Sequence, residues 1–233
     1  MSLIRLDKFV SVALNLSRAD TKRLIRDGKI VVDGVCIKKG DFKVDTQTMT
    51  VKMGNEQLEY KEFIYILMNK PSGILSASND KRAKTVVDII PDSLKRDGLF
   101  PVGRLDKDTT GLLIITNDGD FAHKIISPKS NIEKEYLAEL DGDITEQMIE
   151  AFKNGVILAD GTQCMSAKLE RAGNCQALVT IREGKYHQVK RMFGTVGLGV
   201  NKLHRNSIGG LSLPKNLKPG DCIELGPEDL KKI

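Results

Sequence analysis

Two apolar patterns open the chain, and both predict helices that a hairpin follows. The first has apolar residues at i, i+3, i+4, i+7 and i+8, the stripe of an amphipathic helix, at Leu6, Phe9, Val10, Ala13 and Leu14. A capping box at residues 17–20 begins a second helix, and Gly28 stands where a C-cap glycine belongs. Residues 30–37 then have the pattern of two short strands joined by an Asp-Gly turn. A small helix-helix-hairpin module is therefore predicted.

A longer region of mixed strand and helix patterns follows this module. Residues 51–62 are polar and charged, and we interpret them as a linker or hinge. Beyond it, strands are predicted at 63–68, 112–115, 135–140 and 177–183, and helices at 86–91, 120–126, 146–154 and 188–196. Because strands and helices do not alternate strictly, the pattern favours an α+β fold over a doubly wound parallel sheet.

The turn at residues 103–111 carries the first candidate for chemistry. Gly103 and Gly111 give the backbone freedom on either side of it, and residues 112–115 form a short apolar run typical of a buried strand. We therefore expect Asp106 at the edge of a core, in a dry cleft. Burial favours the neutral form of a carboxyl group, whereas a nucleophile or base must be charged, so a fixed Lys or Arg is expected beside it. Asp108 belongs to a common turn composition, and we expect a structural role for it.

The charge distribution adds a partner to this picture. Residues 1–43 hold ten Lys or Arg against five Asp or Glu, which accounts for the whole net charge of +5. A basic module attached to a neutral body predicts a polyanionic partner. A second cationic stretch, residues 182–205, has six Lys or Arg and one Glu, and it contains the candidate partners of Asp106.

The sequence also narrows the compartment and the chemistry. No apolar run approaches the roughly 20 residues of a membrane span, and the first ten residues have no signal pattern. The four cysteines lack metal-ligand spacing, and no nucleotide-binding motif is present. We therefore predict a cytoplasmic protein that uses no metal and no cofactor.

The N-terminal module resembles the S4 RNA-binding domain, over about residues 3–50. The resemblance rests on residues 5–9, 17–25 and 28–34. It implies a division into an RNA-binding domain, 1–58, and a second domain, 59–233. RNA contacts are then expected from basic side chains of the module, namely Arg5, Lys8, Arg18, Lys22, Arg23, Arg26 and Lys29. The alternative is that these cations are only the solvated face of a helix.

The whole chain resembles the RsuA-like family of pseudouridine synthases, in which an S4 module precedes the catalytic domain. Five motifs occur in order, at residues 69–73, 103–113, 134–136, 183–192 and 203–210. The resemblance implies a mixed, mainly antiparallel central sheet and Asp106 as the catalytic aspartate. It also implies that Tyr136 stacks on the target base and that Lys190 is the basic partner of the aspartate. Substrate contacts are implied for Arg104, Leu203, Lys70, His187 and Arg191.

Two assignments within the motifs stay open. Relatives in neighbouring families have Arg at the position of Lys190, and an ammonium cannot hold a carboxylate bidentately, so Arg191 is the alternative partner. His187 and His204 are possible general bases, but the implied reaction needs no histidine, and RNA contact or helix capping is the favoured interpretation.

The implied reaction is the isomerisation of a uridine in RNA. The bond from C1′ to N1 breaks, the uracil turns, and C5 bonds to C1′, so every product atom is already in the substrate. Asp106 either attacks C1′ or takes a proton from C2′, and the sequence does not choose between these routes. The base must leave its stack, and stacking on Tyr136 returns about 1–3 kcal/mol.

Residues 187–192 resemble the small-subunit enzyme of the family more than its large-subunit relatives. The expected partner is therefore 16S rRNA, free or within a small-subunit assembly intermediate, and the expected state is a monomer. Three alternatives remain: a synthase that acts on 23S rRNA, a non-catalytic RNA-binding ribosome factor, and an RNA N-glycoside hydrolase that releases uracil. The sequence does not determine which uridine is modified or how the S4 module is oriented.

Overall fold

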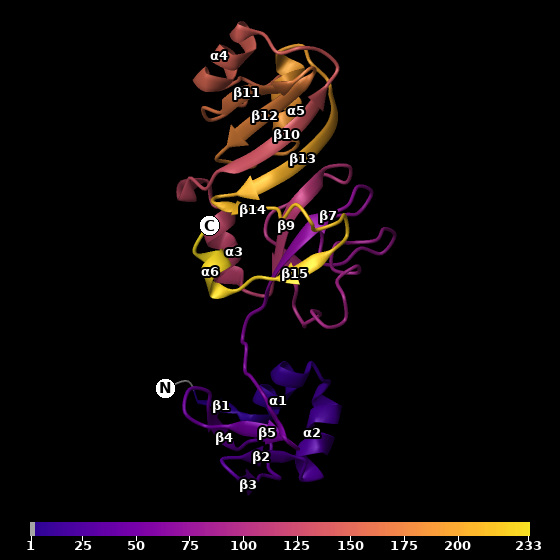
Figure 1. The fold of residues 1–233 in the computed structure, drawn as a ribbon, viewed down its shortest axis with the longest axis vertical. Coiled ribbons are helices and arrows are strands. Elements are labelled where there is room, and N and C mark those ends of the chain that lie inside the picture. The colour runs from indigo at the N-terminus through magenta and orange to yellow at the C-terminus, as the bar shows by residue number, and fades with distance from the viewer. Residues whose placement is uncertain (1–2) are drawn as a thin grey trace. The chain divides into compact units, whose positions relative to one another are not determined.

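The computed structural model describes residues 3–233, and the chain divides after Ile64 into two compact units (Figure 1). Among the described residues, none of the helices is both long and apolar enough to cross a membrane.

The first unit contains the two predicted helices and the predicted hairpin. Its elements are β1 (Leu3–Arg5), α1 (Leu6–Leu14), α2 (Arg18–Arg26), β2 (Ile30–Val32), β3 (Val35–Cys36), β4 (Lys43–Asp45), β5 (Val51–Met53) and β6 (Glu56–Gln57). The Ser17 hydroxyl accepts a hydrogen bond from the amide of Asp20 and so caps α2. Asp33 and Gly34 both have positive φ, as a tight hairpin between β2 and β3 requires.

The linker predicted at residues 51–62 is wrong over its first half. Strand β5 pairs with β2, and β6 pairs with β5, which gives the order β3-β2-β5-β6 within residues 3–64. Val51 and Leu58 are buried in the core of this unit with the apolar faces of α1 and α2. The polar residues that suggested a linker form the exposed turn and the outer side of the β5–β6 hairpin. Successive side chains of a strand point to opposite faces, so these polar residues lie outside while Val51 is buried.

The second unit is built on one mixed sheet. Its elements are β7 (Tyr65–Lys70), β8 (Phe100–Pro101), β9 (Thr110–Thr116), α3 (Gly119–Ile126), the 3-10 helix η1 (Pro128–Ser130), β10 (Lys134–Leu140), α4 (Glu146–Asn154), β11 (Lys168–Gly173), β12 (Gln176–Ile181), α5 (Gln188–Thr195), β13 (Val200–Ile208), β14 (Leu211–Ser212), β15 (Cys222–Glu224) and α6 (Pro227–Leu230). The strand order is β11-β12-β10-β13-β9-β7-β15, with β14 on β13 and β8 on β9.

The sheet is antiparallel except where β13 meets β9. The α+β fold with a mixed, mainly antiparallel sheet is therefore confirmed. The parallel contact is short and brings the backbone of Arg205 against Gly111. A Cβ at Gly111 would lie 2.4 Å from the Arg205 carbonyl oxygen, and the φ of Gly111 is +103°. Only glycine fits this point, which joins the two halves of the sheet.

The helix predicted at residues 86–91 is wrong. The segment is a turn in which Val86 and Ile90 are buried. The Asp88 carboxylate accepts hydrogen bonds from the amide and the hydroxyl of Thr85, 2.8 and 2.9 Å long. A side chain that bonds the local backbone in this way competes with helical hydrogen bonds, and Pro91 supplies no amide to continue them.

Candidate active site

The loop that carries Asp106 connects β8 to the buried strand β9. Gly103, with φ +76°, turns the chain into the loop, and the amide of Thr109 donates to the Asp106 carbonyl to form a tight turn. Residues 111–116 of β9 are all buried. Asp106 therefore sits directly beside a rigid core strand, as predicted.

Two side chains form hydrogen bonds to the backbone of this loop. The Lys70 ammonium donates to the carbonyl oxygens of Pro71, Lys107 and Thr109 at 3.0, 3.1 and 2.9 Å. The Ser76 hydroxyl donates to the Leu105 carbonyl at 2.9 Å and accepts from the Leu105 amide. Such bonds at both ends of the turn limit how far Asp106 can move.

Lys70 itself has no exposed surface, and burial lowers its pKa to about 8. It is not among the residues that line the cavity described below, and its contact with substrate stays a prediction. Its position under the loop makes it a support for Asp106, because its buried amine is bonded to three carbonyls.

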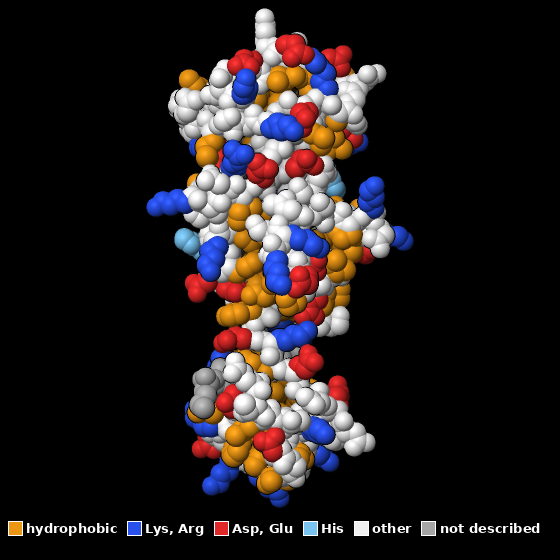
Figure 2. Space-filling view, turned by 60° about the vertical axis from the view of Figure 1, so that its left-hand side comes forward, with side chains coloured by type: hydrophobic (Ala, Val, Ile, Leu, Met, Phe, Trp, Pro, Cys, Tyr) orange, Lys and Arg blue, Asp and Glu red, His pale blue; other side chains and the backbone are white. Residues whose placement is uncertain are grey.

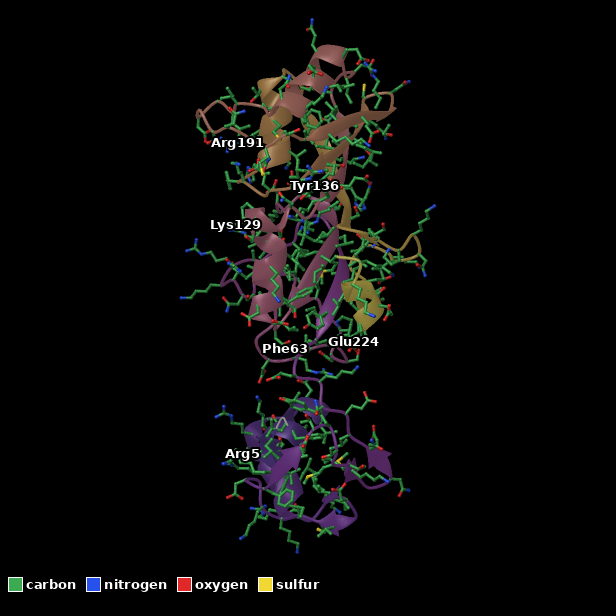
Figure 3. All side chains as sticks on the ribbon, turned by 90° about the vertical axis from the view of Figure 1, so that its left-hand side faces the viewer. Arg5, Phe63, Lys129, Tyr136, Arg191 and Glu224 are labelled. Atoms are coloured by element: carbon green, nitrogen blue, oxygen red, sulfur yellow. The ribbon has the colours of Figure 1, made fainter. Side chains whose placement is uncertain are left out.

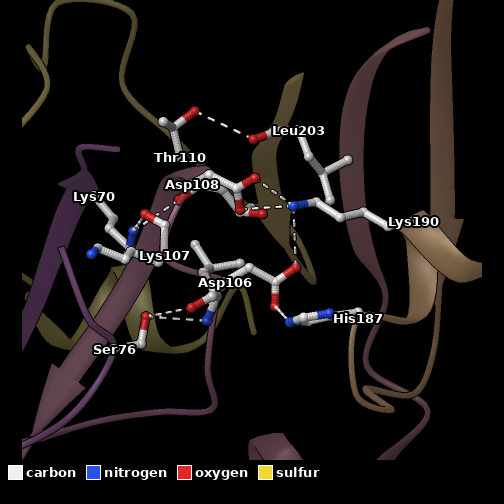
Figure 4. Close-up of polar contacts among 11 residues, drawn as sticks. Lys70, Ser76, Asp106, Lys107, Asp108, Thr110, His187, Lys190 and Leu203 are labelled. Atoms are coloured by element: carbon white, nitrogen blue, oxygen red, sulfur yellow. Dashed lines mark hydrogen bonds and ion pairs between the residues drawn. The ribbon is translucent and has the colours of Figure 1, made fainter. Parts of the chain in front are cut away.

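The Asp106 carboxylate faces two side chains of the cationic stretch (Figure 4). One oxygen lies 3.4 Å from Nε2 of His187, and the other lies 3.7 Å from Nζ of Lys190. The side chain of Asp106 is 24% exposed, so the cleft is wetter than the sequence suggested. Lys190 is thus within ion-pair distance of Asp106, and its role as the basic partner stays a prediction.

Lys190 is shared between two carboxylates. Its ammonium lies 2.7 Å from both oxygens of Asp108, closer than it lies to Asp106. The hydrogen bond from Lys190 lowers the pKa of Asp108. Arg191, the alternative partner, is paired with Asp160 instead and also donates to the Tyr186 carbonyl. In this arrangement it is therefore Lys190, and not Arg191, that contacts Asp106.

The loop before α5 positions His187 and Lys190. Glu183 is buried and accepts hydrogen bonds from the Met165 amide and the Gln188 side chain, both at 2.8 Å, and from Lys185. Burial works against ionisation here, but these bonds outweigh it and lower the pKa of Glu183. His187 begins α5 in the left-handed region, with φ +46° and no side-chain capping bond. This backbone turns its imidazole toward Asp106.

Tyr136, labelled in Figure 3, lies on β10. It pairs with Arg205 on the neighbouring strand β13. Its hydroxyl is 3.3 Å from Nη1 of Arg205, and the guanidinium carbon lies 5.8 Å from the centre of its ring. Arg205 is buried, donates through Nε to the Leu112 carbonyl, and leaves Nη2 without a partner. Tyr136 is therefore oriented by a buried cation.

These groups line one cavity of about 720 Å³. Asp106, Arg104, Tyr136, His187 and Arg205 contribute to its wall together with apolar residues of the 101–105 segment and of α3. A smaller adjoining cavity of about 70 Å³ is lined by Leu203 as well as by Asp106 and Tyr136. The cavity combines two carboxylates, Asp106 and Glu183, two tyrosine rings and several cations. Aromatic and cationic groups together suit a base with its negatively charged backbone.

Comparison with known proteins identifies the family of this chain. The family model described as RNA pseudouridylate synthase matches residues 64–195, and the S4 domain model matches residues 4–49. The chain belongs to the RNA pseudouridylate synthase family. It is therefore a pseudouridine synthase, an isomerase, with an S4 domain at its N-terminal end.

Relatives and a solved structure agree over nearly the whole chain. An uncharacterised RNA pseudouridine synthase of Bacillus subtilis is 42% identical over 231 residues and covers 97% of each chain. Ribosomal small subunit pseudouridine synthase A of Escherichia coli is 37% identical and covers 99% of this chain and 100% of its own. A crystal structure of a pseudouridylate synthase, 34% identical in sequence, superposes with a TM-score of 0.69. The match covers 98% of this chain and 99% of the other. The enzyme is thus of the RsuA type, and the family resemblance is confirmed.

The predicted RNA-binding side chains of the S4 domain lie on its surface, among the Lys and Arg side chains that Figure 2 shows there. All are exposed, namely Arg5, Lys8, Arg18, Lys22, Arg23, Arg26 and Lys29. Several form ion pairs with neighbouring acids, such as Arg23 with Asp20 at 2.6 Å and Arg26 with Asp27 at 3.4 Å. Exposed pairs of this kind are weak and leave the cations able to exchange partners. RNA contact by these side chains stays a prediction.

Three residues of the site escaped the sequence interpretation. Ser76 carries no motif at all, and nothing in its neighbours signals that it bonds Leu105. Lys134 and Arg205 lie in motifs that support the family resemblance, but among the other polar residues of β10 and β13 they have no pattern that assigns them to the cavity. Both are buried, and burial lowers the pKa of Lys134.

Proposed function

We propose that this enzyme converts a uridine of 16S rRNA to pseudouridine, with Asp106 as the catalytic carboxylate. Tyr136 stacks on the extruded uracil, and Lys190 is the basic partner of the carboxylate. The observation that carries the proposal is the meeting of Asp106 and Tyr136 in one cavity, with Lys190 3.7 Å from the carboxylate. The enzyme works in the cytoplasm as a monomer.

Each group has a task that its position supports. An ionised Asp106 can attack C1′ or remove the C2′ proton, and either step helps the C1′–N1 bond to break. The freed uracil turns against the ring of Tyr136, and its C5 bonds to C1′. On the first route this step displaces the Asp106 carboxylate from C1′, and on the second Asp106 returns the proton to C2′. The C5 proton then leaves to solvent while N1 gains one. Arg104, Leu203 and His187 lie on the cavity walls, where they can contact the nucleotide.

The 16S target is supported by relatives. Ribosomal small subunit pseudouridine synthase A of Vibrio cholerae is 38% identical over 231 residues, and the E. coli protein of this name is 37% identical, both over nearly their full lengths. Similarity that includes the S4 domain as well as the catalytic domain favours a shared class of RNA. A synthase for 23S rRNA is the alternative of the same chemistry.

The test is tritium release from transcripts that carry [5-³H]uridine. The purified enzyme is incubated with 16S rRNA, with 23S rRNA and with small-subunit assembly intermediates, and the product is analysed for pseudouridine and free uracil. Release with pseudouridine from 16S rRNA alone is expected. Release from 23S rRNA alone would replace the target, free uracil would indicate a hydrolase, and no release from any RNA would leave only a binding protein.

A further inference from the structure

Tyr186 stands at the rim of the active-site cavity with its side chain in solvent. It is 76% exposed, more than any other large hydrophobic side chain that is exposed within residues 3–233. An exposed aromatic ring of this kind offers a flat apolar face to a ligand. Tyr186 lines the cavity that holds Asp106 and Tyr136.

The ring of Tyr186 has a stacking partner within the site. It stacks on the imidazole of His187, with ring centres 3.8 Å apart and planes 20° from parallel. His187 in turn lies 3.4 Å from Asp106, and the carbonyl of Tyr186 accepts a hydrogen bond from Arg191. The left-handed backbone of His187 is a strained conformation for a residue other than glycine, and strain of this kind gathers at functional sites.

The cavity that the ring lines has more cations than acids, since five Lys or Arg face Asp106 and Glu183, and Glu183 is paired with Lys185. Lys185 precedes it in the chain and lines the same cavity, as does Arg104. His187 covers one face of the ring, and a flat aromatic surface flanked by cations fits a nucleobase whose phosphates lie beside it. A protein partner would instead need a broad apolar patch around the tyrosine.

We propose that Tyr186 is a stacking platform for an RNA base that neighbours the extruded uridine. The inference rests on the proposed function, since it takes the cavity as the place of the target nucleotide. Tyr136 then contacts the target inside the cavity, while Tyr186 and His187 hold the adjoining base at its mouth. The platform draws the neighbouring nucleotide away from the RNA helix and so keeps the target uridine extruded.

A single tryptophan can report this contact, because the chain contains none. We design Tyr186→Trp and titrate it with a pentamer of adenosine ribonucleotides and with the matching abasic ribose-phosphate pentamer. The pentamer with bases should quench the fluorescence, and the abasic one should leave it unchanged. Ile223→Trp is the control, since Ile223 on β15 is partly exposed and lies outside the residues that line either cavity.

Equal quenching by both pentamers, or none by either, would overturn the platform. Quenching of Ile223→Trp to the same degree would overturn it too. The fluorescence titration requires no turnover, so its result on stacking is independent of the test of the proposed function. It can also be recorded in an Asp106→Asn background.

Kinetics provide the second readout. Tyr186→Ala should lower kcat/KM for RNA by about 5- to 150-fold, the loss that corresponds to 1–3 kcal/mol of base stacking. Tyr186→Phe should retain activity within about twofold, because stacking needs the ring and not the hydroxyl. Tyr186 would not act by stacking if Tyr186→Ala retained as much activity as Tyr186→Phe. The same would follow if Tyr186→Phe lost as much activity as Tyr186→Ala.

Discussion

At the scale of single residues, one lysine of the candidate active site is shared between two aspartates. Lys190 bonds both oxygens of Asp108 at 2.7 Å but lies 3.7 Å from Asp106. Asp106 is 24% exposed and lines the cavity, whereas Asp108 is 68% exposed. The closer ion pair is therefore the more solvated one, and the carboxylate that faces the cavity is the less firmly bound.

Replacement of the two aspartates should separate these roles. Asp106→Asn should keep the fold and the RNA affinity but lower kcat by at least about 10²–10⁴-fold, the usual loss of a charged catalytic group. Asp108→Asn should lower kcat by less than about tenfold, because Lys190 can then move fully to Asp106. Tritium release and filter binding measure the two effects, and equal losses of activity would contradict the assignment.

Lys70 makes stability depend on pH in the alkaline range. Its pKa is lowered from 10.5 to about 8 by burial, so below pH 8 both states carry the proton and the penalty of burying the charge is complete. Between about pH 8 and 10.5 the unfolded chain binds more protons than the folded one, and the stability contributed by this group rises with pH.

We expect the difference in unfolding free energy between the wild type and Lys70→Met to shift by about 2–3 kcal/mol in favour of the wild type from pH 7 to pH 10. Urea denaturation at several pH values measures it. Methionine does not titrate, so other groups cancel in the comparison. Parallel stability curves would show that the Lys70 amine keeps its ordinary pKa in the folded chain.

At the scale of elements, the sheet depends on a close approach between β9 and β13. The two strands pair in parallel only at His204 with Thr110 and at Arg205 with Gly111. This contact places Tyr136 and Arg205, on one half of the sheet, beside the loop of Asp106 on the other half. The candidate active site therefore lies where the two halves of the sheet join.

Gly111→Ala should destabilise the enzyme by about 2–5 kcal/mol, from an unfavourable backbone and from a Cβ pressed against the Arg205 backbone. Thermal and urea denaturation measure the loss. Gly119→Ala is the matched control, since nothing lies within 4 Å of its Cβ position and it begins α3. That control should change stability by less than about 1 kcal/mol, and a comparable effect at both positions would contradict the role of the crossing.

The strong periodic patterns predicted their elements well, and the weak ones did not. The stripe in residues 6–14, the cap at Ser17 and the Asp-Gly hairpin are local signals, and the structure confirms all three. Residues 51–57 and 86–91 were misjudged for opposite reasons. Strands β5 and β6 are short and mostly polar, so they lack a clear apolar pattern. Residues 86–91 have an apolar pattern, but the local hydrogen bonds involve the side chains of Thr85 and Asp88.

At the scale of the whole molecule, the chain separates affinity from chemistry. The excess of cations belongs to residues 1–43, and the carboxylate site belongs to the second unit. We expect the S4 domain to supply most of the salt-dependent binding to RNA. In particular, Arg23 and Arg26 on α2 are exposed and only weakly paired.

Charge reversal at Arg23 and Arg26 should weaken RNA binding and flatten its dependence on salt. Each phosphate contact that is lost should reduce the slope of log K against log salt by about 0.7–0.9. Fluorescence anisotropy between 50 and 300 mM salt, roughly the span in which such contacts are screened, measures the slope. The same reversal at Lys231 and Lys232, near α6, is the control for net charge, and an unchanged slope in the S4 variant would mean that this face does not bind RNA.

The sequence by itself determined which local elements form around residues 6–37, and that an aspartate in a glycine-flanked turn lies against a buried strand. It also determined the family, because five motifs keep their order along the chain. These features depend on neighbouring residues, whose spacing the chain displays directly.

Only the tertiary structure decided which groups meet. It paired Lys190 with Asp108 as well as Asp106, sent Arg191 to Asp160, buried Lys70 beneath the loop and left Tyr186 at the cavity mouth. Contacts between residues far apart in the chain follow from the register of β9, β10 and β13 and from the packing of α5, and no local pattern encodes that register.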